Sequence, residues 1–403
     1  MQSGKIISSS GTEIRYSFSS GSEDTAGIGG GIGTAHPGGT ATGEYHLMLT
    51  PSVGTSAGRQ FREIEEALEE FIATRGMIFP LVVFQRFFSS DVSNHAPLLR
   101  PVRTGKGGSS VSLVQQPPAS GNKLMAWVYL IDFRQKAPET LNEKHTFSLT
   151  HNGYRHLYTS GMTSPSQQGS YDQTAAIFGE YIRDLQKKGL TLAGNCIRTW
   201  IFVRDIDNNY GGMVSARNAI FDREGLTPAT RFITSTGIEG QTEKTNTLVA
   251  MDAYAIGGIT PAQVRHLNAL THLSPTHDYG VAFERGTAVD YGDRRHILIS
   301  GTASIDHKGK IVHPGDIARQ TERTFENIGA LLAEGDATFA NISSMIVYLR
   351  DLADTRFITA WLQERFPDIP TVVAIAPVCR PGWLVEVECT AAIAVSNPQF
   401  RNF

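Results

Sequence analysis

Residues 384–389 read Leu384-Val385-Glu386-Val387-Glu388-Cys389, an alternation of apolar and polar side chains that is typical of a β-strand with one face in a core. The segment recurs as Leu248-Val249-Ala250-Met251-Asp252-Ala253 and, more loosely, as Leu124-Met125-Ala126-Trp127-Val128-Tyr129. Glu386 corresponds to an alanine in both earlier copies, Ala250 and Ala126. The chain therefore repeats one structural unit, and a single copy has an acid at this position.

Two further segments repeat in the same order. Leu157-Tyr158-Thr159-Ser160-Gly161 returns as Leu298-Ile299-Ser300-Gly301, and Ile201-Phe202-Val203-Arg204-Asp205-Ile206 returns as Val347-Tyr348-Leu349-Arg350-Asp351-Leu352. Both segments have the composition of strands. Apolar residues at three- and four-residue spacing predict one amphipathic helix in each copy, over residues 61–74, 171–188 and 317–334.

The repeats predict an α+β fold of three tandem domains. The expected domains are residues 1–140, with a Gly-rich N-terminal loop, residues 141–262, and residues 270–403, which carry the acid. The expected seams lie near residues 135–144 and 257–275, and the second seam includes a short helix at residues 261–269. Units of this length are domains rather than solenoid repeats, and three of them pack most simply around a pseudo-threefold axis.

Composition limits the classes of partner. The 403 residues have a net charge of -3 and no basic patch, which argues against a nucleic-acid partner. The three cysteines show neither a disulfide framework nor CxxC spacing, which favours a reducing compartment. Residues 1–16 are polar and no apolar run is long enough for a bilayer. We expect a cytoplasmic monomer without a membrane partner, a metal or another cofactor.

Three other patterns predict no chemistry. Gly54-Thr55-Ser56-Ala57-Gly58 matches the nucleophile-elbow pattern GxSxG, but tandem α+β units do not provide its doubly wound sheet, so a loop of small residues is expected. His145, His151 and His156 lack the spacing of a metal site. The Gly-rich stretch at residues 19–43 predicts a mobile surface loop rather than a dinucleotide-binding loop. Whether the first domain contributes to a site stays open.

The alternation places Glu386 and Glu388 on one strand face at a domain junction. Partial desolvation there raises the pKa of a carboxyl group and makes it a usable general acid near neutral pH. A solvated strand face is the alternative for Glu386 and the favoured interpretation of Glu388. Cys379 lies seven residues earlier and can reach the same pocket, although buried thiols are often inert.

Arginines of the second copy predict a carboxylate-binding surface. Tyr210 and Arg217 lie on a predicted helix, and Arg231 follows it. A guanidinium binds a carboxylate through a planar fork, best where water is partly excluded. Surface salt bridges are the alternative for Arg217 and Arg231.

These repeats resemble the RidA/YjgF superfamily, whose small α+β domains of chorismate-mutase-like fold assemble as trimers with sites between subunits. Within it, the chain resembles the chorismatases, which remove pyruvate from chorismate. The motifs that carry this resemblance are Ile299-Ser300-Gly301-Thr302-Ala303-Ser304-Ile305, Gly315-Asp316, Gln320-Thr321, Glu326-Asn327-Ile328, Arg198-Thr199-Trp200, Tyr210 with Arg217 and Phe221, Thr236-Gly237-Ile238, and residues 379–386.

The resemblance implies a metal-independent enzyme that acts on a small carboxylate substrate and yields pyruvate with a hydroxybenzoate or a dihydrodiol. Glu386 resembles the acid that protonates the enol ether, and Cys379 resembles a position that steers the product toward a 3-hydroxybenzoate. The residues that resemble substrate-binding groups are Arg217, Arg231, Tyr210, Arg285, Arg380 and Gly237.

Two alternatives remain. The imine deaminases of the superfamily combine an arginine with the strand glutamate in one unit, whereas here Arg231 and Glu386 belong to different copies. A deaminase would gain support if Arg231 faced Glu386. A non-catalytic ligand-binding protein of the same fold is the third possibility, and the presence of the acid in one copy argues against it.

Overall fold

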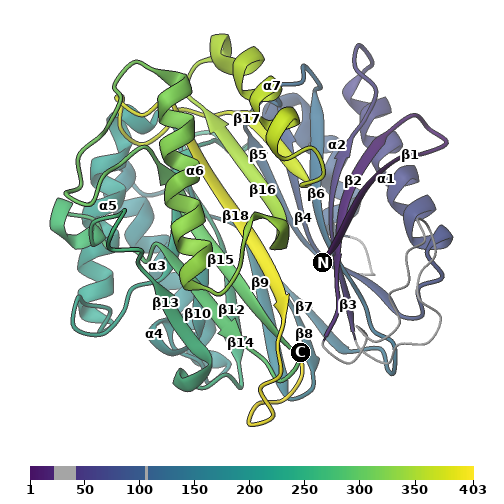
Figure 1. The fold of residues 1–403 in the computed structure, drawn as a ribbon, viewed down its shortest axis with the longest axis horizontal. Coiled ribbons are helices and arrows are strands. Elements are labelled where there is room, and N and C mark those ends of the chain that lie inside the picture. The colour runs from purple at the N-terminus through teal and green to yellow at the C-terminus, as the bar shows by residue number, and fades with distance from the viewer. Residues whose placement is uncertain (22–41, 105–107) are drawn as a thin grey trace.

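The computed structural model describes residues 1–21, 42–104 and 108–403, and Figure 1 shows their arrangement. Most of the Gly-rich stretch predicted as a surface loop, residues 22–41, lies outside the described residues. The three parts of the chain each form one six-stranded sheet with helices on one side, which confirms the α+β prediction. Within the described ranges, no helix combines the length and apolar character needed to cross a bilayer.

Each domain has the same element order, three strands, a helix, a strand, a second helix and two strands. The first domain contains β1 (Gln2–Ile7), β2 (Glu13–Ser19), β3 (Gly43–Thr50), α1 (Ala57–Thr74), β4 (Pro80–Ser89), α2 (Val92–Thr104), β5 (Ser110–Gln115) and β6 (Leu124–Asp132). The second contains β7 (Glu139–Glu143), β8 (Thr146–His151), β9 (Tyr154–Thr163), α3 (Gly169–Lys187), the short α4 (Leu192–Asn195), β10 (Cys196–Val203), α5 (Ile206–Arg223), β11 (Thr234–Glu239) and β12 (Val249–Gly257).

The third domain contains β13 (Val264–Leu267), β14 (Gly286–Asp290), β15 (Arg294–Ala303), α6 (Ile317–Glu334), β16 (Ile342–Leu349), α7 (Thr355–Arg365), β17 (Thr371–Ile375) and β18 (Val385–Ala394). Four 3-10 turns accompany these elements, η2 (Pro261–Gln263), η3 (Thr276–Tyr279), η4 (Phe339–Asn341) and η5 (Leu352–Asp354). The last strand of each domain lies inside its sheet, as β18 lies between β15 and β16. Strand pairs are antiparallel except β4 with β5, β10 with β11, and β16 with β17.

The three domains close into a ring. The last residue of β5, β11 or β17 donates its backbone N–H to a carbonyl of the next domain, always two residues past the equivalent strand end. The three bonds are Gln115 to Gln241 at 2.9 Å, Glu239 to Pro377 at 3.2 Å, and Ile375 to Pro117 at 2.8 Å. The same contact therefore joins the first domain to the second, the second to the third and the third to the first, and the chain forms an internal pseudo-trimer.

Helix α6 forms where the sequence predicts it and supports the third sheet. Asp316 caps its N-terminus by accepting a hydrogen bond from the Arg319 N–H at 3.0 Å. Its buried face packs against β15 and β18. Asn327 donates from this face to the carbonyls of Ala303 and Ile305, both at 3.1 Å. The helix thereby fixes the end of β15, which becomes one wall of the candidate site.

Two local predictions differ from the structure. The helix predicted at residues 261–269 is wrong, because η2 ends at Gln263 and residues 264–267 pair with β14 as an edge strand. The stretch expected as the first seam holds another edge strand, β7. Short exposed edge strands have little periodicity, so hydrophobic patterning does not reveal them. The Ser56 hydroxyl caps α1 by accepting from the Arg59 N–H at 3.3 Å, as expected for a loop rather than a nucleophile.

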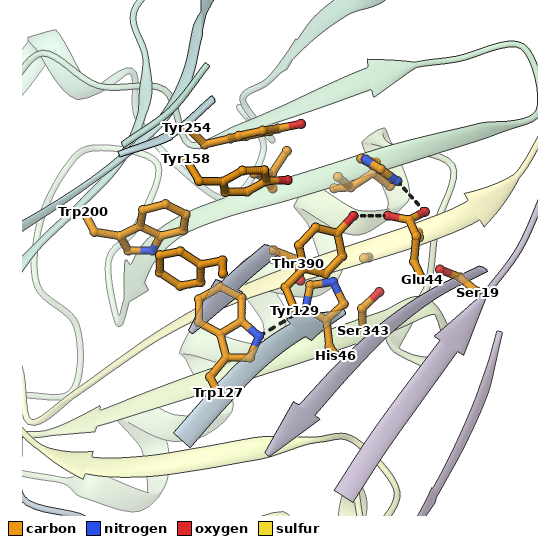
Figure 2. A pocket seen from close by; sticks show the side chains of 16 residues that line it. Ser19, Glu44, His46, Trp127, Tyr129, Tyr158, Trp200, Tyr254, Ser343 and Thr390 are labelled. Carbon is orange, nitrogen blue, oxygen red and sulfur yellow. Dashed lines mark hydrogen bonds and ion pairs between the residues drawn. The ribbon is translucent and has the colours of Figure 1, made fainter. Parts of the chain in front are cut away.

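The inner faces of the sheets enclose a central cavity of about 70 Å³, shown in Figure 2. Aromatic rings from the first and second domains line it, including Trp127, Tyr158 and Tyr254. Its buried carboxylate, Glu44, accepts hydrogen bonds from Tyr129 and from Arg294 at 2.6 Å, and contacts His296 Nε2 at 2.9 Å. These partners hold the pKa of Glu44 well below its usual value against the effect of burial. The charge of Glu44 is therefore compensated within the protein.

Candidate active site

A second cavity, of about 30 Å³, lies at the junction of the second and third domains. Seven of the eight residues predicted for the site line it, namely Tyr210, Arg217, Gly237, Arg285, Cys379, Arg380 and Glu386. Ser235, Tyr279, Val281, Phe283, Gly301, Ala303, Ile305 and Trp383 complete the lining. The structure thus brings together residues that are up to 176 positions apart in the chain, Tyr210 and Glu386.

Strand register defines the position of Glu386 in the repeat. In each sheet, the pairing between the last strand and β4, β10 or β16 is interrupted by a bulge. The first pair of residues after the bulge is Phe84 with Tyr129, Arg198 with Tyr254, or Ser344 with Thr390. On the last strands, the equivalent residues of these pairs are Tyr129, Tyr254 and Thr390. The residues four positions before them, Met125, Ala250 and Glu386, are therefore equivalent to one another. The counterpart of Glu386 in the first domain is therefore Met125 rather than Ala126, which lies on the opposite strand face. The carboxyl group is present in the third copy alone of these three.

Glu386 is held in a desolvated position against Gly301 of β15. A side chain at Gly301 would collide with the Glu386 carboxyl group, so glycine permits their close approach. Burial, followed by the charge of Glu388, raises the pKa of Glu386 to about 8, while Arg198 and Arg285 oppose the shift. Glu386 is consequently protonated at neutral pH and can donate a proton.

Arg217 of α5 points a buried guanidinium into the same cavity. Only 1% of its surface is exposed, and its Nε and Nη2 have no hydrogen-bond partner among the described residues. These two nitrogens form the fork that binds a carboxylate side-on. Burial lowers the pKa of Arg217, and the neighbouring Tyr210, Cys379 and Tyr279 oppose this shift without cancelling it. The arrangement favours an anionic ligand.

Two further guanidinium groups stack on aromatic rings in the third domain. Arg285 lies 5.4 Å from the ring centroids of Tyr279 and Phe283 and donates to the Ser274 carbonyl at 3.1 and 3.3 Å. Arg380 lies 4.9 Å from the Tyr279 centroid and 5.2 Å from that of Trp383. Cation–π contacts orient both groups without neutralising them. Three cations thus surround one neutral acid.

Cys379 faces the cavity as a neutral thiol. Burial raises its pKa to about 12, so it is not a thiolate nucleophile at neutral pH. Burial also raises the pKa of the neighbouring Tyr210 hydroxyl well above its usual value. Gly237 lets the Tyr210 ring approach closely, because a side chain there would meet this ring at 3.3 Å. These residues give the cavity its shape and its neutral hydrogen-bonding groups.

Arg231 lies outside this cavity. It lines a separate one of about 260 Å³, with Thr227, His266, His277 and Glu284 among the other lining residues. Its guanidinium donates to the Ala193 carbonyl, through Nε at 2.9 Å and also through Nη2. Phe283 and Arg285 line both cavities and separate Arg231 from Glu386.

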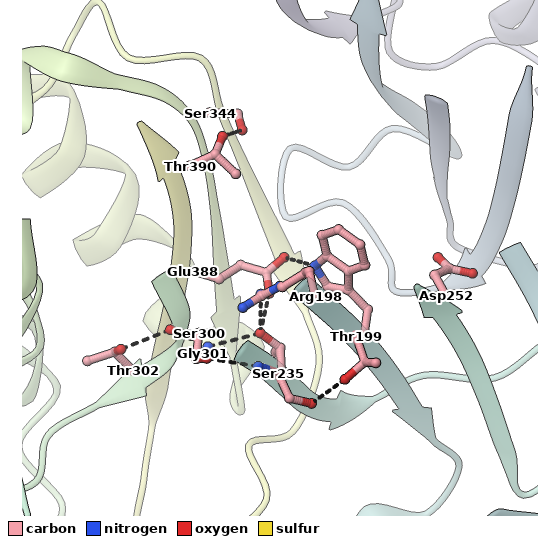
Figure 3. Close-up of polar contacts among 12 residues, drawn as sticks. Arg198, Thr199, Ser235, Asp252, Ser300, Gly301, Thr302, Ser344, Glu388 and Thr390 are labelled. Carbon is pink, nitrogen blue, oxygen red and sulfur yellow. Dashed lines mark hydrogen bonds and ion pairs between the residues drawn. The ribbon is translucent and has the colours of Figure 1, made fainter. Parts of the chain in front are cut away.

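The prediction that Glu388 lies on a solvated strand face is wrong. Its side chain is buried and binds three groups of the second domain, which Figure 3 shows in part. Arg198 Nη2 donates to it at 2.6 Å, Trp200 Nε1 at 2.9 Å, and the Thr236 hydroxyl also donates. The alternation of apolar and polar residues correctly placed Glu386 and Glu388 on one strand face. A local sequence pattern does not reveal that the neighbouring domain covers this face.

Residues 268–285, between β13 and β14, cover the cavity. In the second domain residues 144–145 alone make the equivalent connection. Asn218 of α5 fixes the longer segment, donating to the Gly280 carbonyl at 2.9 Å and accepting from the Ala282 N–H at 3.1 Å. The segment supplies Tyr279, a lining residue that the sequence did not identify because it follows a presumed seam. In the sequence, the one indication of this segment was that the repeat is interrupted there.

The site combines a protonated carboxylic acid with three guanidinium groups in a space that largely excludes water. Such a set can bind an anionic substrate and donate a proton to it. Among the described residues, no cluster of three or more His, Cys, Asp or Glu side chains could hold a metal ion.

Comparisons with known proteins match the third domain by sequence. The family model described as Endoribonuclease L-PSP matches residues 286–393. A RutC family protein of Pyrococcus abyssi is 34% identical over 97 residues, which are 24% of this chain and 76% of that protein. The 3-aminoacrylate deaminase RutC of Acinetobacter baylyi is 31% identical over 99 residues, 24% of this chain and 79% of that protein.

A match to a solved structure extends over most of the chain. A crystal structure of a chorismatase superposes with a TM-score of 0.60 and 18% sequence identity, covering 77% of this chain and 93% of that one. At this identity, the match demonstrates a shared fold across the domains. Together with the sequence matches of the third domain, it shows that the chain belongs to the RidA/YjgF superfamily, with three tandem domains in a chorismatase-like arrangement.

Proposed function

We propose that the protein is an enzyme that cleaves the enol ether of chorismate or of a similar cyclic dicarboxylate and releases pyruvate. One observation carries the proposal: a protonated Glu386 shares a buried cavity with the unpaired fork of Arg217. The fold shared with a chorismatase supports the same substrate class. The guanidinium groups of the cavity can bind both carboxylates of a dicarboxylate substrate, and the protonated Glu386 can donate a proton to an enol ether.

In the proposed reaction, Glu386 protonates the terminal methylene carbon of the enol ether. The methylene becomes a methyl group, and the ether carbon becomes an electrophilic oxocarbenium centre. Water adds to this carbon and returns a proton to the Glu386 carboxylate. The resulting hemiketal breaks its bond to the ring oxygen, which takes up the hydroxyl proton, and the products are pyruvate and a cyclic diol. A hydroxybenzoate forms instead when the diol loses one water molecule and the ring becomes aromatic. Cys379 faces the cavity and is our candidate for the residue that influences this outcome.

The cavity is smaller than the space such a substrate occupies, because pockets for small molecules usually measure about 300–1,000 Å³. We propose that residues 268–285, which cover the cavity, move away from α5 when substrate enters. This movement would open the two hydrogen bonds of Asn218.

Incubation of purified protein with chorismate, coupled to lactate dehydrogenase and NADH, tests the proposal. Pyruvate should appear in step with chorismate loss, and chromatography of the ring product should identify a diol or a hydroxybenzoate. Folded protein that releases no pyruvate would refute it. If ammonia is released from 2-aminoacrylate instead, the protein is a deaminase like the matched RutC protein.

Activity should depend on pH as expected for a general acid. Because Glu386 has a raised pKa of about 8, its reactive protonated form predominates below pH 8. We expect kcat/KM to be level from neutral pH up to about 8 and then to fall about tenfold per pH unit, since the protonated fraction falls by that factor. Initial rates in buffers of constant ionic strength measure this profile. A rate that rises above pH 8 would contradict the assignment.

Arg231→Gln should leave catalysis almost unchanged. Arg231 binds the Ala193 carbonyl and lines the neighbouring cavity, so we expect kcat/KM for chorismate to fall less than about threefold, within the range of indirect effects. Steady-state kinetics of the variant provide the measurement. A loss of two orders of magnitude would bring Arg231 back into the substrate site and would favour the deaminase alternative.

A further inference from the structure

Glu388 lies two residues beyond Glu386 and on the same face of β18, and the second domain donates its side-chain hydrogen bonds. Arg198, Trp200 and Thr236 donate to its two carboxylate oxygens, as Figure 3 shows for Arg198. A fourth group, Arg86 Nη1 of the first domain, lies 3.9 Å from Oε1. The position of this carboxylate is therefore determined by other domains rather than by its own strand.

A short chain of contacts connects Glu388 to the proposed acid. The Thr236 hydroxyl donates to Glu388 and accepts from the Gly301 N–H at 2.9 Å. Gly301 in turn lies against the Glu386 carboxyl group. The backbone that supports Glu386 is thus fixed to the Glu388 cluster, which is defined here as Glu388, Arg198, Trp200 and Thr236.

The charged and titratable groups that face Glu386 come from every element around it. They are Glu388 on β18, Arg198 on β10, Tyr348 on β16, Tyr210 and Arg217 on α5, Tyr279 and Arg285 in the covering segment, and Cys379 and Arg380 before β18. Apart from Glu386 itself, Glu388 is the single carboxylate in this set, and four of the groups are guanidinium cations.

We propose that Glu388 is a positioning residue for the Glu386 site, whose carboxylate neutralises the buried Arg198 guanidinium so that Glu386 keeps its proton. This inference rests on the proposed role of Glu386 as proton donor. Without Glu388, Arg198 would be a buried cation with no counterion, and its charge would favour the ionised form of Glu386 with no neighbouring carboxylate to offset it. An ionised Glu386 could not donate.

The raised pKa of Glu386 agrees with this geometry, because the charge of Glu388 raises it and the charge of Arg198 lowers it. The two charges act in opposite directions while the pair is intact, and burial is the largest cause of the raised pKa. The function of Glu388 is therefore electrostatic compensation as well as an interdomain contact.

The junction of the first and second domains contains a matched control. Asp252 is the residue equivalent to Glu388, since both lie two positions after the residues equivalent to each other, Ala250 and Glu386. Arg86 donates to Asp252 at 2.9 Å, and Asp252 accepts from the Gly161 N–H at 2.9 Å. This junction has the buried ion pair, but Ala250 stands where the third domain has Glu386. Arg86 also lies 3.9 Å from Glu388, so Asp252→Asn changes a charge that reaches Glu386 through Glu388, whereas Glu388→Gln removes the carboxylate beside Glu386 itself.

The test compares pH profiles of kcat/KM for the wild type, Glu388→Gln and Asp252→Asn. Glu388→Gln should move the alkaline limit down from about 8 by about 1 pH unit or more, because the charge of Arg198 then acts on Glu386 without compensation. The result is a loss of about fivefold or more in activity at pH 8, where about half of the wild-type Glu386 is protonated. Asp252→Asn should lower the melting temperature and move the alkaline limit by much less than Glu388→Gln does, because Glu388 still lies between Arg86 and Glu386.

Two further variants keep the test decisive if Glu388→Gln does not fold. Arg198→Met should move the limit upward, because Glu388 then acts on Glu386 unopposed, and Glu388→Asp should restore the wild-type limit. General damage to the fold cannot shift the limit in opposite directions. If the limit is the same in all variants, or if Asp252→Asn moves it equally, the proposal is overturned.

A measurement without substrate separates this inference from the proposed function. The difference in unfolding free energy between the wild type and Glu386→Gln varies with pH up to the pKa of Glu386 and is constant above it. The pH at which the variation ends, called here its upper limit, therefore reports that pKa. Repeating the comparison in the Glu388→Gln background should lower this upper limit by the same shift. An unchanged limit refutes the inference even in a protein that releases no pyruvate, whereas a lowered limit supports it whichever substrate the site accepts.

Discussion

Glu386→Gln should abolish pyruvate release from chorismate, with kcat reduced about 10³-fold, within the range that general acid catalysis contributes. Glutamine has nearly the same shape as a protonated carboxyl group but cannot transfer a proton to carbon. KM should change little, because the three guanidinium groups that bind the substrate stay in place. Stopped assays with high enzyme concentration measure the residual rate.

The same variant should be more stable than the wild type at alkaline pH. The folded pKa of Glu386 is about 8 and its ordinary value is 4.5, so the folded state holds this proton more tightly than the unfolded state does. The stabilisation from the bound proton is complete below pH 4.5 and is lost as the pH rises to about 8. Relative to the wild type, Glu386→Gln should therefore gain stability across this window in urea titrations.

Glu284→Gln provides a matched control for the loss of activity. Glu284 is also a buried acid with a pKa raised by burial, but it lies in the neighbouring cavity, where its Oε1 accepts from the Phe232 N–H at 2.7 Å. A glutamine retains that acceptor. We expect kcat within about threefold of the wild type, as for an uncoupled site. If Glu386→Gln keeps more than a tenth of the wild-type rate, another group supplies the proton.

The fold was largely predictable from sequence because the repeats are long and ordered. Matched segments such as those around Ser160 and Ser300 give the number of domains, and the α6 prediction at residues 317–334 agrees with the structure. The edge strands β7 and β13 were not predictable, because they are short and acquire their conformation by pairing with the next strand. The alignment of Glu386 with Ala126 failed for a related reason, since a one-residue shift in register changes the strand face.

The sequence predicted the residue types of the site better than their positions in space. Arginines, a tyrosine and an acid suggested a carboxylate site, and the structure brings seven of the eight named residues to one cavity. Phe283 and Arg285 lie between Arg231 and the candidate site. They belong to residues 268–285, which are much longer than the equivalent connection in the second domain, so the repeat did not reveal this separation. Glu388 was misjudged because Arg198, its partner, is 190 residues away in sequence.

Arg217→Met should raise KM for chorismate about 100-fold, because truncating a buried charge partner typically costs 2–5 kcal/mol, and about 1.4 kcal/mol corresponds to a factor of ten. The fork formed by Nε and Nη2 has no other partner among the described residues, so its binding energy is available to a substrate carboxylate. Methionine fills a similar volume without charge. Initial rates over a wide chorismate range separate KM from kcat, and kcat should fall less than KM rises.

Loss of affinity should accompany a gain in stability. In the absence of substrate Arg217 is a buried cation without a carboxylate partner, and burial of such a group disfavours folding. Arg217→Met should therefore raise the melting temperature, and added chorismate should stabilise the wild type more than the variant. Arg217→Lys separates charge from geometry, because an ammonium group keeps the charge but cannot form a side-on fork. If Arg217→Lys has the wild-type KM, the fork is not what binds the carboxylate.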